Sequence, residues 1–372
     1  MNAARYLRRL ALAALLLTAA LAALNFYADP YGVWRYGLPG DSISSRPAIR
    51  NQERMHKAHA VRLADADCLI LGNSRVIVGL DPNHPALPEK TYNLGISAAN
   101  IYECYRYLQH AVALKKPKLV LLAIDKGMFD ADSTPEVDFD EERLAVDSGN
   151  HPQPRWRWAD IPETLLSLDA LVDSLKTLRD RTGVQYKDGI RDEVLMKPYT
   201  IPAKILVEND RWKDGSRKFA WNDKKGENVQ RSAFEQMLVF CAAQKIELRI
   251  FTNPLHSEML DIEYGDGRDF SEWAKWLANN ISQTSEVRSP DEPSRTTLFS
   301  FHNFYHFLPE NSEPFPKPDD KVSEMQSYWE ISHYRKAVGD RVIAEVMNNK
   351  VHPQGNWLET LKAEREKWKA GR

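Results

Sequence analysis

The 372-residue chain has few cysteines, no basic block and no nucleotide-binding motif. Its three cysteines, Cys68, Cys104 and Cys241, each fall in an apolar stretch, which predicts buried thiols and argues against a disulfide framework. The 50 Lys and Arg residues are balanced by 52 Asp and Glu residues without any cluster of positive charge, which argues against nucleic acid as a partner. Because neither a P-loop nor a dinucleotide fingerprint is present, we expect no cofactor.

Long hydrophobic runs are also scarce, and the one that stands out extends from Leu10 to Phe26. As a helix it would be about 26 Å long, close to the thickness of a bilayer core. Arg5, Arg8 and Arg9 precede it, so the positive-inside rule places the N-terminus in the cytoplasm and the rest of the chain outside it. Ala20-Leu21-Ala22 also fits the cleavage site of a signal peptide, but the length of the run favours an uncleaved anchor.

Apolar runs alternate with helical periodicities in the remaining sequence. Continuous apolar runs predict buried strands over 67–71, 91–94, 118–124, 246–252 and 297–301. Helical spacing predicts helices over 98–115 with Ser97 as its cap, over 163–181, over 227–244 and after His333. This alternation predicts an α/β fold, namely a three-layer α/β/α domain with a mainly parallel sheet, preceded by one N-terminal transmembrane helix.

The same patterns divide the chain into regions. The predicted regions are an anchor or signal peptide over 1–28, a linker over 29–60, an α/β domain over 61–130 and 226–350, an insertion or cap over 131–225, and a charged helical tail over 351–372.

Two motifs carry the chemistry. Gly72-Asn73-Ser74-Arg75 follows a predicted strand, where an α/β protein exposes a serine hydroxyl at the carboxyl edge of its sheet. Far along the chain, Glu330-Ile331-Ser332-His333 places a histidine three residues after a carboxylate. The residues predict Ser74 as nucleophile, His333 as its base and Glu330 as the group that orients His333. The structural alternatives are a turn serine and a histidine bonded to backbone at the start of a helix.

With these motifs in place, the chain resembles the SGNH (GDSL-like) hydrolase superfamily, in particular exported, membrane-anchored members linked to bacterial polysaccharide O-acetylation. Gly72-Asn73-Ser74-Arg75 is similar to the nucleophile block, Tyr92-Asn93-Leu94-Gly95 to the second block, and Glu330-Ile331-Ser332-His333 to the Asp-x-x-His block. The resemblance implies an oxyanion hole formed by the amides of Ser74 and Gly95.

The chain departs from that superfamily at two positions. Asp125 stands where the third block has an asparagine that donates to the oxyanion, and a carboxylate cannot donate. Asn93 and Asn100 are the candidates to replace that donor. Glu330 stands in place of the usual aspartate. These departures leave open a catalytically inactive domain that binds glycan or helps to assemble a polysaccharide export complex.

Further polar and aromatic residues have two interpretations each. Arg75 could bind an anionic group of the substrate or form an ion pair within the domain. Asp125 could contact the substrate or pair with Arg75. His302 and His306, with His256 and His333, raise a metal-dependent hydrolase as a third reading, but no helical pattern surrounds them and we expect no metal. Trp156 and Trp158 suit sugar stacking, although packing of the insertion is the favoured interpretation.

The sequence as a whole predicts an exported serine esterase or O-acyltransferase that acts on acyl groups of a cell-surface or exopolysaccharide glycan. The expected location is the inner membrane, with a single span and the C-terminal domain in the periplasm. The expected partners are an acyl-sugar or glycan substrate and a membrane protein that carries acyl groups outward.

Overall fold

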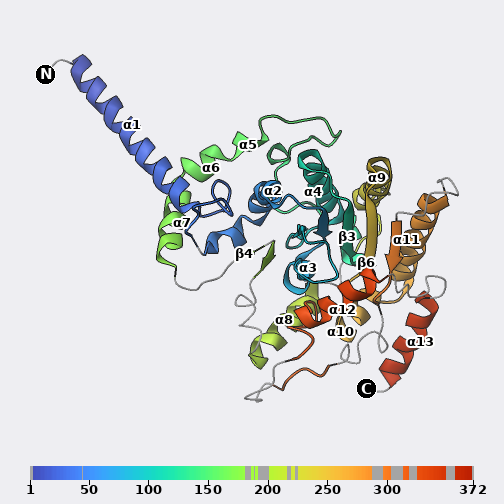
Figure 1. Cartoon of the computed structure of the whole chain (residues 1–372). Helices are drawn as coiled ribbons and strands as arrows, with labels where there is room; N and C mark the ends of the chain where they lie inside the picture. The colour runs from blue at the N-terminus through green and yellow to red at the C-terminus, as the bar shows by residue number, and fades with distance from the viewer. Residues whose placement is uncertain are drawn as a thin grey trace. The chain divides into compact units, whose positions relative to one another are not determined.

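A computed structural model describes residues 3–43, 45–180, 186–187, 189–191, 201–215, 219–222, 225–286, 296–302, 313–317, 325–348 and 357–370. The chain forms two compact units. The first comprises Met1–Leu63 and Asp138–Tyr186, and the second comprises Ala64–Val137 and Lys187–Arg372. The N-terminal segment, which ends at Leu63, is thus joined in one unit with a segment that begins only at Asp138, as the blue and green ribbons of Figure 1 show.

Helices dominate the first unit and alternate with strands in the second. The first unit contains α1 (Ala3–Ala28), η1 (Pro47–Asn51), α2 (Glu53–Ala64), η3 (Glu141–Arg143), α5 (Trp156–Ala159), α6 (Ile161–Leu165) and α7 (Leu168–Arg179). A two-stranded sheet pairs β4 (Tyr186–Lys187) with β5 (Ile190–Arg191). The second unit contains β1 (Cys68–Leu71), α3 (Ser74–Gly79), β2 (Thr91–Asn93), α4 (Ile101–Leu114), β3 (Leu119–Ile124), η2 (Lys126–Phe129), α8 (Pro202–Gly215), α9 (Val229–Gln244), β6 (Glu247–Thr252), α10 (Ser257–Tyr264), α11 (Arg268–Glu286), β7 (Thr296–Phe299), α12 (Lys336–Met347) and α13 (Trp357–Ala370).

A five-stranded parallel sheet in the order β2-β1-β3-β6-β7 forms the centre of the second unit. The mixed α/β class with a parallel sheet is therefore as the sequence predicts. β3 is buried at all six positions, which explains its unbroken apolar sequence. The order reverses between β1 and β3, and such switch points are where parallel sheets place ligand sites.

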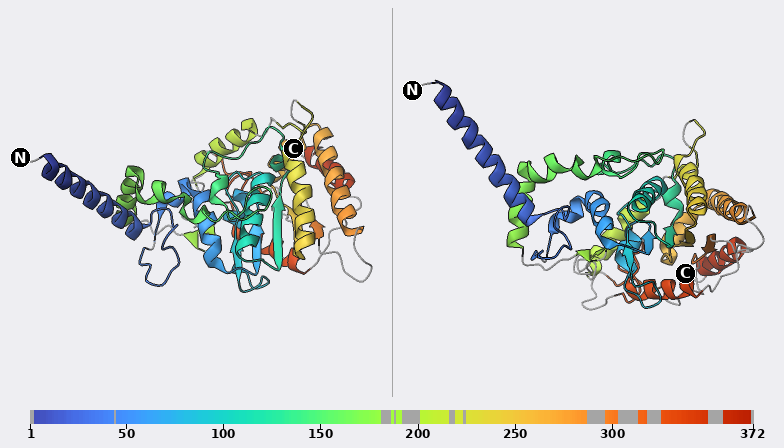
Figure 2. Two further views of the ribbon diagram at one scale, coloured as in Figure 1. Left: turned by 90° about the horizontal axis from the view of Figure 1, so that it is seen from above. Right: turned by 45° about the horizontal axis from the view of Figure 1, so that its top comes forward.

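Helices cover both faces of this sheet. Successive side chains of a strand point to opposite faces, and both sets are buried here because each face is covered. Ile70, Leu121 and Phe251 face a core shared with α3 and α12. Leu69, Val120 and Ile250 point to the other face and are equally buried. Figure 2 shows the strands of the second unit between helices on either side.

α3, which begins at Ser74, lies against α12 with almost no space between them. A Cβ built on Gly339 of α12 would stand 1.8 Å from the carbonyl oxygen of Gly79 at the end of α3. A Cβ on Gly79 would in turn meet the Tyr334 ring at 2.1 Å. The two glycines let the helix that carries Ser74 approach the segment that carries His333.

Replacing Gly339 with alanine is therefore expected to destabilise the protein by about 1–3 kcal/mol, because the added methyl overpacks a backbone contact. Gly127→Ala is a matched control, since a Cβ there meets nothing within 4 Å. Urea unfolding of the detergent-solubilised chain measures both variants. Equal stability of the two would show that α12 can shift away from α3 at little cost.

Sequence periodicity identified the five strands of the sheet and the helices α4, α9 and α12. It did not predict α8, α10 or α11, and it assigned the cap of α4 to the wrong residue. Asn100, and not Ser97, caps α4: its side chain accepts from the Glu103 amide, and the Glu103 carboxylate accepts from the Asn100 amide. This reciprocal capping box satisfies two amides at the helix start, which a single serine does not.

The predicted linker over 29–60 is largely ordered within the first unit. It contains η1 and most of α2, a helix whose residues from Glu53 to Val61 are all buried. Directly after α1, the Asp29 carboxylate accepts hydrogen bonds from the amides of residues 33–36. These bonds fold the chain into a compact turn. From composition alone, the same residues are predicted to be part of a polar linker. The predicted insertion over 131–225 is likewise divided between the two units at Asp138 and Tyr186.

Among the described residues, α1 is the one helix long and apolar enough to cross a membrane. A signal sequence passes the same test of length and composition.

Candidate active site

The carboxyl ends of the parallel strands bring together residues from four distant parts of the second unit. Ser74 follows β1, Asp125 follows β3, Asn253 follows β6 and His302 follows β7 by a few residues. Because parallel strands all end at the same edge, these side chains gather there although the sequence separates them.

Ser74, His333 and Glu330 form a continuous chain of hydrogen bonds. Oγ of Ser74 lies 2.8 Å from Nε2 of His333, and Nδ1 of His333 bonds to Oε1 of Glu330. Glu330 is fully buried, and its carboxylate also accepts from the amides of Ser332 at 2.8 Å and His333 at 2.9 Å. The glutamate thus bends back onto its own loop, which accommodates its extra methylene relative to aspartate.

Arg75 ties the Glu330–His333 loop to the sheet edge. Its Nε and Nη2 donate to the carbonyl oxygen and to Oγ of Ser332, both at 3.0 Å, and its Nη1 donates to Oδ2 of Asp125 at 2.5 Å. The Ile331 amide also donates to Oδ1 of Asn209 in α8, at 3.0 Å. These contacts hold the loop from both sides and thereby place His333 against Ser74.

The buried ion pair of Arg75 and Asp125 is the structural alternative that the sequence left open. Oδ2 of Asp125 also accepts from Nδ2 of Asn73 and of Asn253, each at 2.8 Å. Burial opposes the charge on Arg75, but Asp125 and Glu263 outweigh it and raise the pKa of Arg75. These internal bonds make the guanidinium a positioning group, and because Arg75 also lines a cavity beside Ser74, its contact with an anionic substrate stays a prediction.

The predicted oxyanion donors differ in their surroundings. The Ser74 amide is the first of α3, a position that has no acceptor within the helix. The Gly95 amide donates to Oδ1 of Asn93 at 3.0 Å, and Nδ2 of Asn93 donates to the carbonyl oxygens of Val76 and Leu80. Gly95 and Asn93 are thus engaged in holding α3, in contrast to the expected role of the Gly95 amide.

Asn100 is better placed, because it lines the same cavity as Ser74. Its Oδ1 caps α4, and its Nδ2 donates to Oγ of Ser133 through a long bond of 3.3 Å. A weak bond of this length is readily exchanged for one to a substrate oxygen. The backbone amide of Ser74 and the side-chain amide of Asn100 are thus placed at this cavity to donate to a substrate oxygen.

A cavity of about 270 Å³ opens beside Ser74. Trp212, whose ring meets the His333 ring edge-on at 5.9 Å between centroids, and Phe219 line it with aromatic surface. The Lys126 ammonium stands 4.3 Å from the centre of the Phe219 ring. The cavity thus combines aromatic walls with polar groups, as a sugar-binding site requires.

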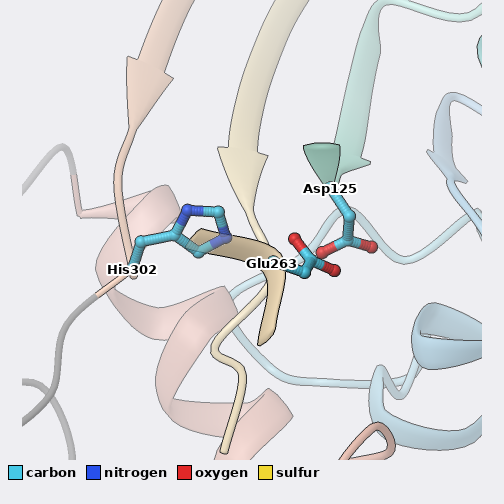
Figure 3. A group of neighbouring side chains, drawn as sticks. All are labelled: Asp125, Glu263 and His302. Atoms are coloured by element: carbon cyan, nitrogen blue, oxygen red, sulfur yellow. The ribbon is translucent and has the colours of Figure 1, made fainter. Parts of the chain in front are cut away.

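Asp125, Glu263 and His302 form a buried cluster that the sequence analysis missed, with one potential ligand atom from each within 4.8 Å of the others. Figure 3 shows the two carboxylates side by side and the His302 ring turned toward Glu263. Burial and the nearby Asp125 raise the pKa of Glu263 to about 7, and burial lowers the pKa of His302 to about 4. No spacing rule could have found this set, because its members follow three separate strands.

Donor types in this cluster would suit a metal ion, but a guanidinium already lies against both of its carboxylates. Arg75 bonds to Asp125 and lies 3.8 Å from Oε1 of Glu263. A divalent cation among these carboxylates would lie close to that positive charge, which repels it. We therefore assign no metal to the cluster.

The remaining predicted residues lie elsewhere. His256 caps α10 and its Nε2 bonds to the carbonyl oxygen of Glu313, and His306 falls outside the described residues. Trp156 and Trp158 belong to the first unit: Trp156 is buried beside His59, as the packing interpretation predicts, whereas Trp158 is exposed. The cavity beside Ser74 uses Trp212 instead, a residue that no sequence motif singled out.

No family model matches this chain, and no curated protein matches it.

Proposed function

We propose that this protein is an exported, membrane-anchored serine esterase or O-acyltransferase of SGNH-like chemistry, acting on O-acyl groups of a cell-surface or exopolysaccharide glycan. The observation that carries the proposal is the unbroken hydrogen-bond chain from Ser74 through His333 to Glu330. A turn serine or a backbone-bonded histidine requires no such partner.

In the proposed reaction, Nε2 of His333 takes the proton from Oγ of Ser74 as that oxygen attacks an ester carbonyl. Glu330 holds the proton on Nδ1, so that Nε2 is the basic nitrogen. The backbone amide of Ser74 and the side-chain amide of Asn100 stabilise the oxyanion. Each such donor contributes a factor of about 10²–10³ to the rate. The alcohol then leaves with the proton from His333, and water or a sugar hydroxyl resolves the acyl-enzyme.

The aromatic walls of the cavity support a glycan as the substrate. Trp212 stands beside His333, so a pyranose stacked on its indole would bring an acyl oxygen close to Ser74. Transfer of acyl groups outside the cytoplasm needs a membrane protein that delivers them, which we expect as a partner.

Features of α1 support a retained inner-membrane anchor with the second unit in the periplasm. Asn25 and Ala28, in the last turns of α1, are fully buried, and Asn25 bonds to residues of α6 and α7. Cleavage before Asn25 would remove the helix that positions these contacts.

The second candidate is an inactive glycan-binding component. Asp125 at the third-block position and the engaged Gly95 amide favour it, because both reduce the number of oxyanion donors.

Labelling with a serine-reactive fluorophosphonate distinguishes the two candidates. We expect one adduct on the detergent-solubilised full-length chain, detected by intact mass, and none on Ser74→Ala. Ser133→Ala, which removes another serine hydroxyl that lines the cavity, is expected to keep the adduct. A folded wild-type protein that takes no adduct would establish the binding component instead.

A further inference from the structure

α7 of the first unit has one buried and one exposed apolar face. Ala170, Ser174 and Thr177 are at most 4% exposed and pack inward. Leu168, Val172 and Leu175, at the same helical spacing on another face, are 71%, 50% and 38% exposed. A soluble surface helix normally carries polar residues on its outer face. An exposed apolar face of this kind indicates that another apolar surface packs against it.

The position of α7 is fixed by the last turns of α1. Nδ2 of Asn25 donates to the carbonyl oxygens of Leu165 at 3.1 Å and Ser167 at 3.4 Å, and Oγ of Ser174 donates to Oδ1 of Asn25 at 2.9 Å. Just after α1, the Tyr31 hydroxyl donates to Asp173 at 3.1 Å. Figures 1 and 2 show α7 beside the C-terminal end of α1.

This end of α1 marks the expected depth of the membrane surface. A bilayer core takes about 20 helical residues, so a span that starts at Leu10 ends near Asp29, about one helical turn beyond Asn25. Phe26 and Tyr27 are 46% and 50% exposed there, and aromatic rings of this kind are enriched at membrane interfaces. The exposed apolar face of α7 is thus attached at the level where headgroups meet acyl chains.

Charges on α7 fit the same surface. Arg179 and Lys176, the latter paired with Asp173 at 2.8 Å, are exposed in the last turn next to Leu175. On an interfacial helix, such side chains extend to the headgroups while the apolar residues enter the acyl region.

We propose that α7 lies in the outer interface of the bilayer that α1 crosses, with Leu168, Val172 and Leu175 inserted among its lipids. The inference rests on the proposed membrane anchor: α7 is hydrogen-bonded to the end of α1, where the proposed span leaves the bilayer, so lipid is the occupant of its apolar face. The first unit is then held to the membrane at two places, by a span and by an interfacial helix. This restricts its tilt and does not depend on any catalytic activity.

The experiment uses the full-length chain in vesicles of phosphatidylethanolamine and phosphatidylglycerol, with intact mass confirming that α1 is retained. Single cysteines replace Leu168, Val172 or Leu175 and carry the fluorophore NBD, because the three native cysteines are buried. His151→Cys is the control in the same unit, at a side chain that is 79% exposed.

We expect blue-shifted emission at the three α7 positions, quenched by lipids with a nitroxide near the headgroup, and water-like, unquenched emission at residue 151. Water-like emission on α7 would overturn the proposal. Blue-shifted emission without quenching by lipid would also overturn it, because it would show that protein covers this face. Urea unfolding of each labelled variant verifies the fold, and Leu168, the most exposed of the three side chains, is the substitution that disturbs packing least.

Discussion

Replacing Glu330 with glutamine is expected to lower the turnover number for a simple ester by about 10⁴-fold, although the side chain keeps its size. Nδ1 of His333 bonds to Oε1 of Glu330, which holds the ring proton on Nδ1 and leaves Nε2 free to accept the proton of Ser74. A glutamine amide turned toward Nδ1 donates, so the ring proton moves to Nε2. The nitrogen that faces Ser74 is then a donor and cannot act as the base.

This prediction is checked with p-nitrophenyl acetate and the full-length protein in detergent. Glu330→Asp is the matched control, because it shortens the side chain but keeps a carboxylate acceptor, and we expect it to retain much more activity than the glutamine variant. A glutamine variant with near wild-type turnover and unchanged stability would contradict the proposed role of Glu330.

Replacing Arg75 with methionine is expected to destabilise the protein by about 3–5 kcal/mol, because it leaves the Asp125 charge buried without its partner. Asp125 is 1% exposed, and only the amides of Asn73 and Asn253 remain bonded to its Oδ2. The variant also loses both bonds to Ser332. We therefore expect slower phosphonate labelling of Ser74, since the loop that positions His333 is released.

Equilibrium urea unfolding measures the loss of stability. The double variant Arg75→Met/Asp125→Asn removes the uncompensated charge and is expected to recover a substantial part of the loss, while labelling stays slow because the Ser332 bonds are still absent. A single Arg75→Met variant as stable as the wild type would show that Asp125 takes up a proton or finds another partner at little cost.

Local sequence signals were sufficient for the strands of the sheet and for the two motifs of the candidate site, but not for α8 and α10, which carry Trp212 and Glu263. Buried runs such as Lys118–Ile124 identified the strands, because a parallel strand covered on both faces must be apolar throughout. The turn before Ser74 and the three-residue spacing of Glu330 and His333 singled out the three residues that the structure joins by hydrogen bonds, since each motif lies within one short segment. Even so, the sequence could not show that His333 reaches Ser74, which lies 259 positions earlier.

The sequence by itself determined the mixed α/β class, the apolar helix at the N-terminus and the residue types able to form a serine–histidine–carboxylate chain, because periodicity and spacing record these locally. Only the tertiary structure decided that Arg75 bonds to Asp125 and to Ser332, that the Gly95 amide is taken by Asn93, and that Glu263 joins Asp125 and His302. It also joined the end of α1 to α7 in one compact unit. The reason is physical: which partner satisfies a buried charge or amide depends on where strand ends and helices meet, and these meetings unite residues from segments far apart in the chain.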